Sequence, residues 1–321
     1  MKIFLLLLLV LVLLLIAISY WLFYIGVCRY PRDKKVKISK KLLPYAEQIN
    51  GGMDWFRSQE LERVEISAYD GTRLVGQYLY HPQTKGTILL MHGFRSDAYY
   101  DFSCAFQAYY ALGYSLLCVH QRAHGLSGGQ YICYGIKERY DCRDWARYLC
   151  DRFGPEHDIF LDGLSMGSST VLMATSLELP KSVRGVIADC GFTSPYEEFK
   201  EILKRMHLPE HPFLDIAEVF SRLMAGFGFR DYSTLEAMRV NTLPVLFLHG
   251  EADDFVPMRF SIENYAACQA EKELITVPGA GHGMSYLLDT ERCKEALGRF
   301  LSRHASVPED SGNAAEAASE A

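Results

Sequence analysis

Short apolar runs recur along the 321-residue chain, and stretches with helical spacing separate them. Runs of this length, bounded by glycine or proline, are typical of strands that are buried on both faces of a sheet. Strands that alternate with helices predict a mostly parallel sheet with helices covering both faces. The predicted strands cover residues 87–93, 114–120, 158–164, 183–190, 244–250 and 273–279.

One stretch before these runs has a different pattern. Residues 63–80 form two segments of alternating apolar and polar positions, which Asp70 and Gly71 divide. An Asp-Gly pair between such segments is a strong signal for a β-hairpin, so we expect antiparallel strands at one edge of the sheet. The predicted helices cover about residues 99–112, 137–153, 168–179 and 286–304.

The interval between the strands at 183–190 and 244–250 is too long for a simple crossover. Amphipathic patterns at 195–206 and 215–228 predict helices within it. Open α/β sheets bind ligands at the carboxyl ends of their strands. We therefore predict a helical lid over those ends, at about residues 192–241. A bulky crossover without a role in binding is the alternative.

The N-terminal segment from Ile3 to Val27 is almost entirely apolar. As a helix, its 25 residues rise roughly 37 Å, which is enough to cross a hydrocarbon core of about 30 Å. A cleaved signal peptide fits less well, because apolar residues continue past the small residues at 17–19. A lipoprotein signal needs a small residue before Cys28, and Val27 stands there. We expect residues 1–28 to be an uncleaved, single-pass membrane anchor.

Basic residues after this segment bear on its orientation. Seven lysines and arginines lie from Arg29 to Lys41, whereas Lys2 and the amino terminus precede the segment. The positive-inside rule then places the main domain on the cytoplasmic side. The predicted organisation is a basic connector at 29–56, the main domain with its lid at 57–305, and a disordered acidic tail at 306–321.

Composition narrows the class of function. About half of the residues are apolar, which is enough for one large core, and the net charge of −6 does not favour a nucleic-acid partner. The nine cysteines include no CxxC pair and no Cys/His metal spacing. Buried free thiols in a reducing compartment are therefore expected.

The central motif is Gly163-Leu164-Ser165-Met166-Gly167, which follows a predicted strand and precedes a predicted helix. It matches the G-x-S-x-G nucleophile elbow, in which a sharp turn projects the serine hydroxyl at the end of a strand. The glycines remove Cβ atoms that would clash in this strained turn. The helix N-terminus adds partial positive charge beside a developing oxyanion. Ser165 is the predicted nucleophile.

A serine nucleophile needs a base that a third group orients. With this kind of elbow, the acid and then the base follow the serine in sequence. Asp253 and Asp254 lie just past the strand at 244–250, and His282 lies in a glycine-rich loop past the next strand. The carboxyl ends of parallel strands meet at one edge of a sheet. We therefore expect His282 and one of the two aspartates to lie beside Ser165.

The first buried strand ends in His92, Gly93 and Phe94. A backbone N–H at this position can point into an oxyanion hole, so the N–H groups of Phe94 and Met166 are the predicted donors. His92 is expected to hold its loop by hydrogen bonds. The glycines at 125–129 lack a phosphate-loop lysine and a dinucleotide context, and no cofactor or metal is predicted.

Six segments together resemble the α/β-hydrolase superfamily, and within it the lid-bearing bacterial hydrolases of the serine aminopeptidase S33 and monoacylglycerol-lipase-like branch. They are MHGF, QRAHGLSGG, GLSMGSSTVLMA, DCGFTSPYEEF, HGEADDFVP and GAGHG, in the family's order from about His92 to Gly283. The resemblance implies an eight-stranded sheet with a helical lid. It also implies that Asp253, at the fifth position of the HG-x-x-D-x-x-V-P loop, is the triad acid, with Asp254 in reserve.

The chain departs from this family at one loop. The usual D-x-R-G-H-G sequence is HQRAHG here, so His120 replaces the acid and Ala123 replaces the first glycine. Neither residue is at a triad position, so the resemblance still implies activity. The departure concerns the local structure around Arg122 and His124.

These residues predict a serine hydrolase that cleaves carboxylic esters through an acyl-serine intermediate. A membrane anchor and a lid favour acyl or lipid-like substrates. A serine peptidase, an aminopeptidase or an acyltransferase would use the same triad. A non-catalytic, membrane-tethered binding protein is the alternative outside enzymes. The lid residues that are candidates for an acyl pocket, or for plain lid packing, are Phe213, Phe220, Met224 and Phe227.

Overall fold

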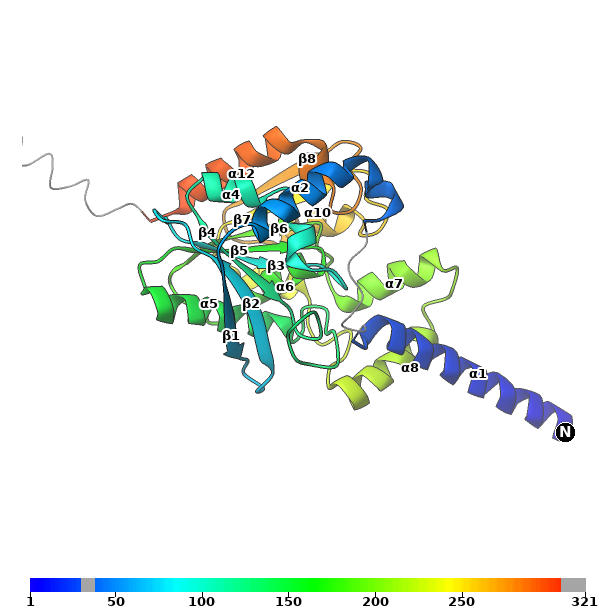
Figure 1. Ribbon diagram of the computed structural model, residues 1–321. Coiled ribbons are helices and arrows are strands. Elements are labelled where there is room, and N and C mark those ends of the chain that lie inside the picture. The colour runs from blue at the N-terminus through cyan, green and yellow to red at the C-terminus, as the bar shows by residue number, and fades with distance from the viewer. Residues whose placement is uncertain (30–37, 307–321) are drawn as a thin grey trace, which may run out of the picture.

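The computed structural model describes residues 1–29 and 38–306 of the chain. Its strands are β1 (Leu61–Ser67), β2 (Arg73–Leu79), β3 (Thr87–Met91), β4 (Ser115–His120), β5 (Ile159–Leu164), β6 (Val183–Asp189), β7 (Val245–Gly250) and β8 (Lys272–Val277). They form one sheet in the order β1-β2-β4-β3-β5-β6-β7-β8 (Figure 1). Strands β3 to β8 are parallel, and β2 is antiparallel to both of its neighbours. The predicted mostly parallel sheet with an antiparallel hairpin at its edge is confirmed.

The central strands are buried on both faces, as their continuous apolar sequences predict. Every residue of β3 is buried. Ile88 and Leu90 face one hydrophobic cluster, and Leu89 and Met91 face the other, because side chains alternate along a strand. The sheet therefore separates two apolar layers.

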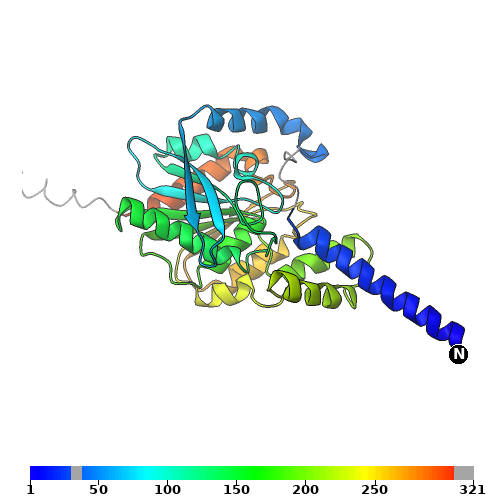
Figure 2. The ribbon, with the colours of Figure 1, turned by 60° about the horizontal axis from the view of Figure 1, so that its bottom comes forward.

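Helices cover both layers (Figure 1, Figure 2). Those on the side of Leu89 are α5 (Glu138–Phe153), α6 (Met166–Ala174), α9 (Thr234–Val240) and α10 (Arg259–Ala267). Those on the side of Ile88 are α2 (Ala46–Arg57), α3 (Ala98–Asp101), α4 (Phe106–Ala111) and α12 (Thr290–His304). This three-layer arrangement confirms the predicted fold class.

Three predicted helices differ in extent from the observed ones. The stretch at 99–112 contains two short helices, α3 and α4, and α6 ends at Ala174 rather than near residue 179. The last stretch divides into α11 (Ser285–Leu288) and α12. Asp289 stands between them, and its side chain accepts the N–H of Arg292, so it caps a new helix.

The predicted connector contains ordered structure in its described part. A 3₁₀ helix, η1 (Lys40–Tyr45), leads into α2, whose Phe56 stacks on Phe106 with ring centroids 4.3 Å apart. At Gly52 a Cβ would lie 1.9 Å from the carbonyl oxygen of Ser103, so the close packing of α2 requires glycine there. Residues 30–37 of the predicted connector and 307–321 of the predicted tail lie outside the described residues.

The predicted lid is helical. It contains α7 (Pro195–Arg205), α8 (Phe213–Phe220), the π-helical turn η2 (Ser221–Ala225) and α9. Ser194 and Ser233 cap α7 and α9 by accepting backbone N–H groups three residues later. Since α9 packs on α6 and α10, the last part of the interval belongs to the main body.

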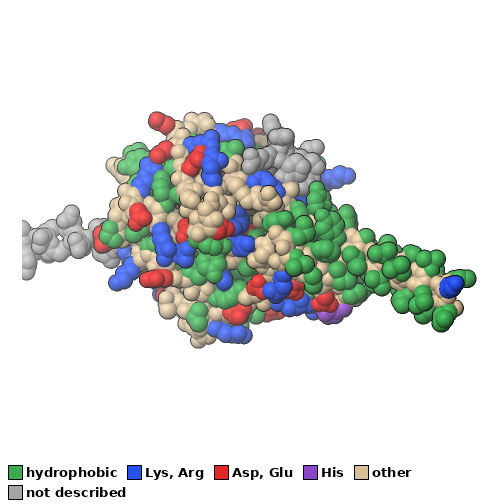
Figure 3. Space-filling model, turned by 90° about the horizontal axis from the view of Figure 1, so that it is seen from below, with side chains coloured by type: hydrophobic (Ala, Val, Ile, Leu, Met, Phe, Trp, Pro, Cys, Tyr) green, Lys and Arg blue, Asp and Glu red, His purple; other side chains and the backbone are tan. Residues whose placement is uncertain are grey.

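The N-terminal helix α1 (Lys2–Val27) packs on α8 and extends away from the domain (Figure 1, Figure 2). It is long and apolar enough to cross a membrane. Hydrophobic side chains cover it along its length (Figure 3). Its last part differs from its exposed first part, because Ser19, Leu22, Phe23 and Val27 are buried. The helix is therefore docked at its C-terminal end.

Candidate active site

Ser165 lies between β5 and α6, at the carboxyl end of a central strand. Its φ of 57° and ψ of −114° are values that a non-glycine residue keeps only when its surroundings hold it there. A Cβ at Gly167 would lie 1.8 Å from the Met91 carbonyl oxygen, and one at Gly163 would lie 2.2 Å from the Gly167 carbonyl oxygen. Both glycines of the motif are therefore required by close backbone packing.

His282 reaches Ser165 from the loop after β8. Its Nε2 is 2.9 Å from Ser165 Oγ, and its Nδ1 is 2.8 Å from Asp253 Oδ2. An ionised carboxylate only accepts hydrogen bonds, so Nδ1 carries the proton and Nε2 accepts from the serine hydroxyl. The three residues that the sequence predicts together thus form one hydrogen-bonded chain.

Of the two candidate acids, only Asp253 lies at His282. The Asp253 Oδ1 atom accepts the backbone N–H groups of Phe255 and Val256 at 2.8 and 2.9 Å, which fixes the carboxylate. The Asp254 side chain is about two-thirds exposed and pairs with Lys41 at 2.6 Å.

Electrostatics stabilises an ionised acid beside a basic imidazole. Burial works to raise the pKa of Asp253, but hydrogen bonds from His249 and His282 outweigh it and hold this pKa well below its usual range. Burial works to lower the pKa of His282, but the hydrogen bond and charge of Asp253 raise it above its usual value. The pair is therefore suited to hold a proton on His282 during a reaction.

The two candidate oxyanion donors belong to segments next to Ser165. Met166 begins α6, and Phe94 follows β3, which pairs with β5. A Cβ at Gly93 would lie 3.4 Å from the Ser165 Cβ, so this loop contacts the elbow. Within the described ranges, no hydrogen bond from the N–H of Phe94 or of Met166 is found. Both groups can therefore donate to a substrate oxygen.

Buried groups hold the loop of Phe94 in place. The carboxylate of Asp101 accepts the N–H of Gly93 and the hydroxyl of Ser96, both at 2.6 Å. Burial raises the pKa of Asp101 to about 7. His92 is fully buried, its Nε2 accepts the N–H of Gln121 at 3.2 Å, and its Nδ1 lies 2.7 Å from the Gly93 carbonyl. His92 thus has the loop-holding contacts that the sequence predicts.

The triad opens into a cavity of about 430 Å³, which is within the range of small-molecule sites. Asp101, Asp162 and Asp189 line it, and the last two are buried. Burial raises the pKa of Asp162 to about 8 and that of Asp189 to about 6. Asp162 accepts the hydroxyl of Tyr109 at 2.6 Å. Asp162 and Asp189 are not among the site residues predicted from the sequence. The signal that could have identified them is an aspartate inside an otherwise apolar strand.

The structure does not bring the four predicted lid residues to this cavity. Phe213 and Phe227 are buried in a separate cluster with α1, and Phe220 lies with its ring 5.1 Å from that of Tyr20. Met224 is largely exposed on η2. Among the described residues that line the cavity at Ser165, none of the four is present. Phe213 and Phe227 therefore fit the alternative prediction, in which they pack within the lid.

One group of possible metal ligands forms within the described residues, namely Cys190, Asp253 and His282. Burial raises the pKa of the Cys190 thiol well above its usual value, which opposes the thiolate that a metal needs. Both ring nitrogens of His282 have hydrogen-bond partners already. The donor set therefore fits a triad better than a metal centre.

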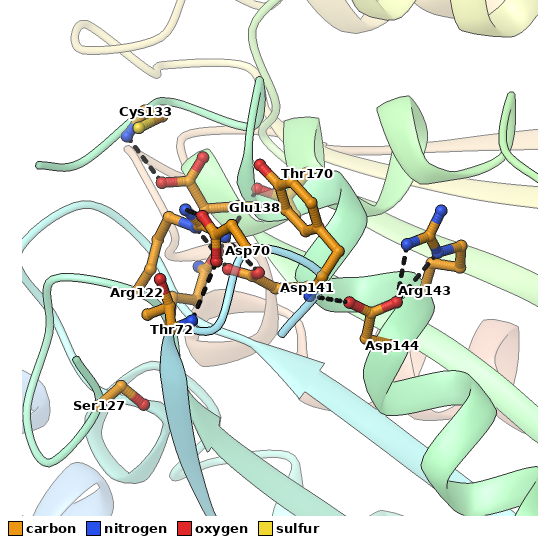
Figure 4. Close-up of polar contacts among 12 residues, drawn as sticks. Asp70, Thr72, Arg122, Ser127, Cys133, Glu138, Asp141, Arg143, Asp144 and Thr170 are labelled. Carbon is orange, nitrogen blue, oxygen red and sulfur yellow. Dashed lines mark hydrogen bonds and ion pairs between the residues drawn. The ribbon is translucent and has the colours of Figure 1, made fainter. Parts of the chain in front are cut away.

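The loop that departs from the family pattern is held by a buried ion pair (Figure 4). The guanidinium of Arg122 donates to both carboxylate oxygens of Asp141 at 2.5 and 2.6 Å, and to Asp70 at 2.9 Å. In the same loop, Nε2 of His124 accepts the backbone N–H of Arg95 at 3.0 Å. The loop therefore connects the β1–β2 hairpin to the segment that carries Phe94.

Comparisons with known proteins agree with the observed fold. The model of a family described as alpha/beta hydrolase fold matches residues 86–237. The uncharacterized protein YqkD of Bacillus subtilis is 28% identical over 259 residues, which cover 79% of this chain and 84% of that protein. Protein bem46 of Schizosaccharomyces pombe is 24% identical over 238 residues, which cover 72% of this chain and 74% of that one.

A solved structure has the same fold. The esterase Pf2001 of Pyrococcus furiosus superposes with a TM-score of 0.65 at 23% sequence identity, over 86% of this chain and all of that one. The narrower S33 and monoacylglycerol-lipase-like branch stays a prediction. The chain therefore has the α/β-hydrolase fold, and the model of that family matches its residues 86–237.

Proposed function

We propose that this protein is a serine hydrolase that cleaves carboxylic esters. The observation that carries the proposal is the hydrogen-bonded chain from Ser165 Oγ through His282 to Asp253, with distances of 2.9 and 2.8 Å. The α/β-hydrolase fold and its esterase neighbours support a hydrolase. The proposal goes further in assigning the serine mechanism and its residues.

In the proposed reaction, Ser165 Oγ attacks the ester carbonyl carbon while His282 Nε2 takes the hydroxyl proton. Asp253 stabilises the imidazolium, and the N–H groups of Phe94 and Met166 stabilise the oxyanion. The C–O bond to the alcohol then breaks, and His282 returns the proton to that alcohol. Water, activated in the same way, attacks the acyl-serine and releases the carboxylic acid.

Labelling with a fluorophosphonate tests the nucleophile. Intact protein is expected to become labelled, and Ser165→Ala is expected to lose the label. Ser168→Ala is a matched control in the helix that follows Ser165: it is also buried, and within the described residues its Oγ has no hydrogen-bond partner. Equal labelling of the Ser165 variant, or none of the intact protein, would refute the proposal.

Peptidase and acyltransferase activity are the alternatives for the same triad, because the triad fixes neither leaving group nor acceptor. That neighbouring solved structures are esterases supports the ester. A panel of p-nitrophenyl esters, monoacylglycerols and aminoacyl amides separates the classes. Faster turnover of amides, or transfer to an added alcohol in place of hydrolysis, would change the assignment.

The proposal includes α1 as a membrane anchor with the catalytic domain in the cytoplasm. The basic residues from Arg29 to Lys41 support this side. A C-terminal tag is expected to resist protease added to intact cells and to be digested after lysis. Digestion in intact cells would place the domain outside, and release of soluble protein from membranes by alkaline carbonate would refute the anchor.

A further inference from the structure

We propose that a second cavity, between α1, α7 and α8, binds the acyl chain of a lipid ester that enters from the bilayer alongside α1. This inference rests on the proposed function, because the chain must be attached to an ester that Ser165 attacks. It assigns to α1 a role in substrate binding in addition to anchoring.

The second cavity is apolar. Its volume is about 230 Å³, and its walls include Phe23 of α1, Phe199 and Leu203 of α7, and Leu214 and Ala217 of α8. Among the described residues that line it, Tyr134 is the one with a polar side chain, and its hydroxyl already donates to the Gly26 carbonyl at 2.9 Å. Such an apolar lining favours apolar ligands.

Two residues lie at the border between this cavity and the active site. Phe94 and Phe255 line both the apolar cavity and the cavity at Ser165. Phe94 also carries one proposed oxyanion donor, and the ring of Phe255 lies 5.0 Å from that of His282. The two cavities are therefore neighbours, and in the proposed arrangement the chain of an ester at Ser165 passes these two rings into the apolar cavity.

The same cavity borders the part of α1 that carries exposed aromatic residues. Tyr20, Trp21 and Tyr24 are exposed, and Trp and Tyr are enriched at the headgroup level of membrane proteins. Leu22 and Phe23, on the buried side of the same turns, line the cavity. A chain that leaves the bilayer at this depth meets the cavity directly.

The wall that α1 provides is fixed to the domain. The guanidinium of Arg29, just after the helix, donates to the carbonyls of Gly125 and Ser127 at 2.7 Å each. The N–H of Ile132 donates to the Val27 carbonyl at 2.7 Å. Because these bonds hold the end of α1 against the domain, they also fix the position of the cavity wall that α1 provides.

The two cavities differ in polarity, so they suit different parts of a lipid ester. The carboxyl groups of Asp101, Asp162 and Asp189 line the cavity at Ser165, and none of them lines the apolar cavity. The hydrocarbon chain is therefore assigned to the apolar cavity and the alcohol portion to the acidic one.

A chain-length series with the full-length protein in nanodiscs tests this assignment. Ala217→Phe places a ring in the apolar cavity, because Ala217 is buried and lines it. Val219→Phe is the matched control on the same helix, where Val219 is about half exposed and does not line the cavity. Leu203→Ala enlarges the same cavity. The substrates are p-nitrophenyl esters from acetate to myristate.

Each methylene that enters an apolar site raises kcat/KM about fourfold, until the site is full. Ala217→Phe is expected to lower kcat/KM for dodecanoate by about 10-fold or more, since excluding two methylenes alone gives about 16-fold. Acetate turnover is expected to stay within about twofold, and Val219→Phe is expected to resemble the native protein. Leu203→Ala should move the optimum to longer chains. An unchanged chain-length profile in both cavity variants overturns the inference.

A long-chain fluorophosphonate with a terminal diazirine, incorporated in phosphatidylcholine nanodiscs, tests the location without turnover. Photolysis is expected to cross-link Ser165-bound probe to residues 22–27 or 199–217. Cross-links confined to 39–42 or 283–287, segments that border the Ser165 cavity and not the apolar cavity, overturn the inference while leaving the nucleophile intact. Absence of all Ser165 labelling would instead refute the proposed function, so the two failures are distinguishable. Labelling with a short fluorophosphonate checks that each variant is folded.

Discussion

Replacement of Asp253 by asparagine tests which acid orients the base. The native carboxylate accepts from His282 Nδ1 at 2.8 Å and is itself fixed by two backbone N–H groups. The asparagine amide keeps the size of the side chain but offers an NH₂ group as well as an oxygen. It therefore permits the wrong imidazole tautomer and no longer stabilises the imidazolium.

The expected loss for Asp253→Asn is about 10³- to 10⁴-fold in kcat, or about 4–5.5 kcal/mol of transition-state stabilisation. This range follows from the corresponding substitution in other serine hydrolases with a Ser-His-Asp triad. The matched variant is Asp254→Asn. Its native side chain is exposed, and its pair with Lys41 contributes about 0–1 kcal/mol, so kcat/KM is expected to change less than about twofold.

Hydrolysis of p-nitrophenyl acetate measures both variants, and the rate of fluorophosphonate labelling measures the nucleophile alone. Thermal unfolding confirms that each variant is folded. Activity of Asp253→Asn within about tenfold of the native enzyme would refute the assignment of Asp253 as the triad acid. A loss of activity in Asp254→Asn as large as that in Asp253→Asn would refute it equally.

Three further predictions concern the pH profile and stability. Since the pKa of His282 is raised, its imidazole stays protonated, and therefore inactive as a base, to a higher pH. We expect kcat/KM to fall on the acid side with a midpoint above 6.5. A midpoint below 6.5 in a pH–rate profile would contradict this. Gly167→Ala is expected to lower the free energy of unfolding by about 3 kcal/mol or more, whereas Gly51→Ala, with no atom within 4 Å of its new Cβ, should leave it unchanged or higher in urea unfolding. Arg122→Met leaves the buried Asp141 carboxylate unpaired and is expected to cost about 3–5 kcal/mol, and the added change Asp141→Leu is expected to restore much of it in the same measurement.

Local sequence signals predicted the parts of the fold that depend on neighbouring residues. The Asp70-Gly71 turn, the buried strands and the elbow at Ser165 each need particular residues at fixed spacings. The order of loops at the strand ends was enough to predict that His282 and an aspartate meet Ser165. Choosing between Asp253 and Asp254 from spacing alone was not possible, because adjacent residues share a loop and only the tertiary structure turns one of them inward.

Features that depend on distant contacts were not predictable in the same way. Helix α2 carries Gly51 and Gly52, which lower helix propensity, and it is stabilised by Phe56 against Phe106 and by close approach to Ser103. The pattern of the lid predicted helices, but it did not show which face of each helix meets Ser165. Buried apolar side chains of the lid helices pack against α1, which is far away in the sequence. The residues predicted to line an acyl pocket therefore do not lie at the triad.

The burial pattern of α1 shows why its two ends have different roles. Residues near its start expose apolar side chains on every side, which suits a lipid environment, whereas Phe23 and Val27 are almost fully buried against the lid. The helix end also receives a hydrogen bond from Arg95, the residue after Phe94, at the Cys28 carbonyl. One continuous helix therefore has an exposed apolar part and an end that contacts the segment carrying a proposed oxyanion donor. Removing it would expose apolar lid residues and release that segment together, so α1 is part of the domain on which it packs and not a separable segment.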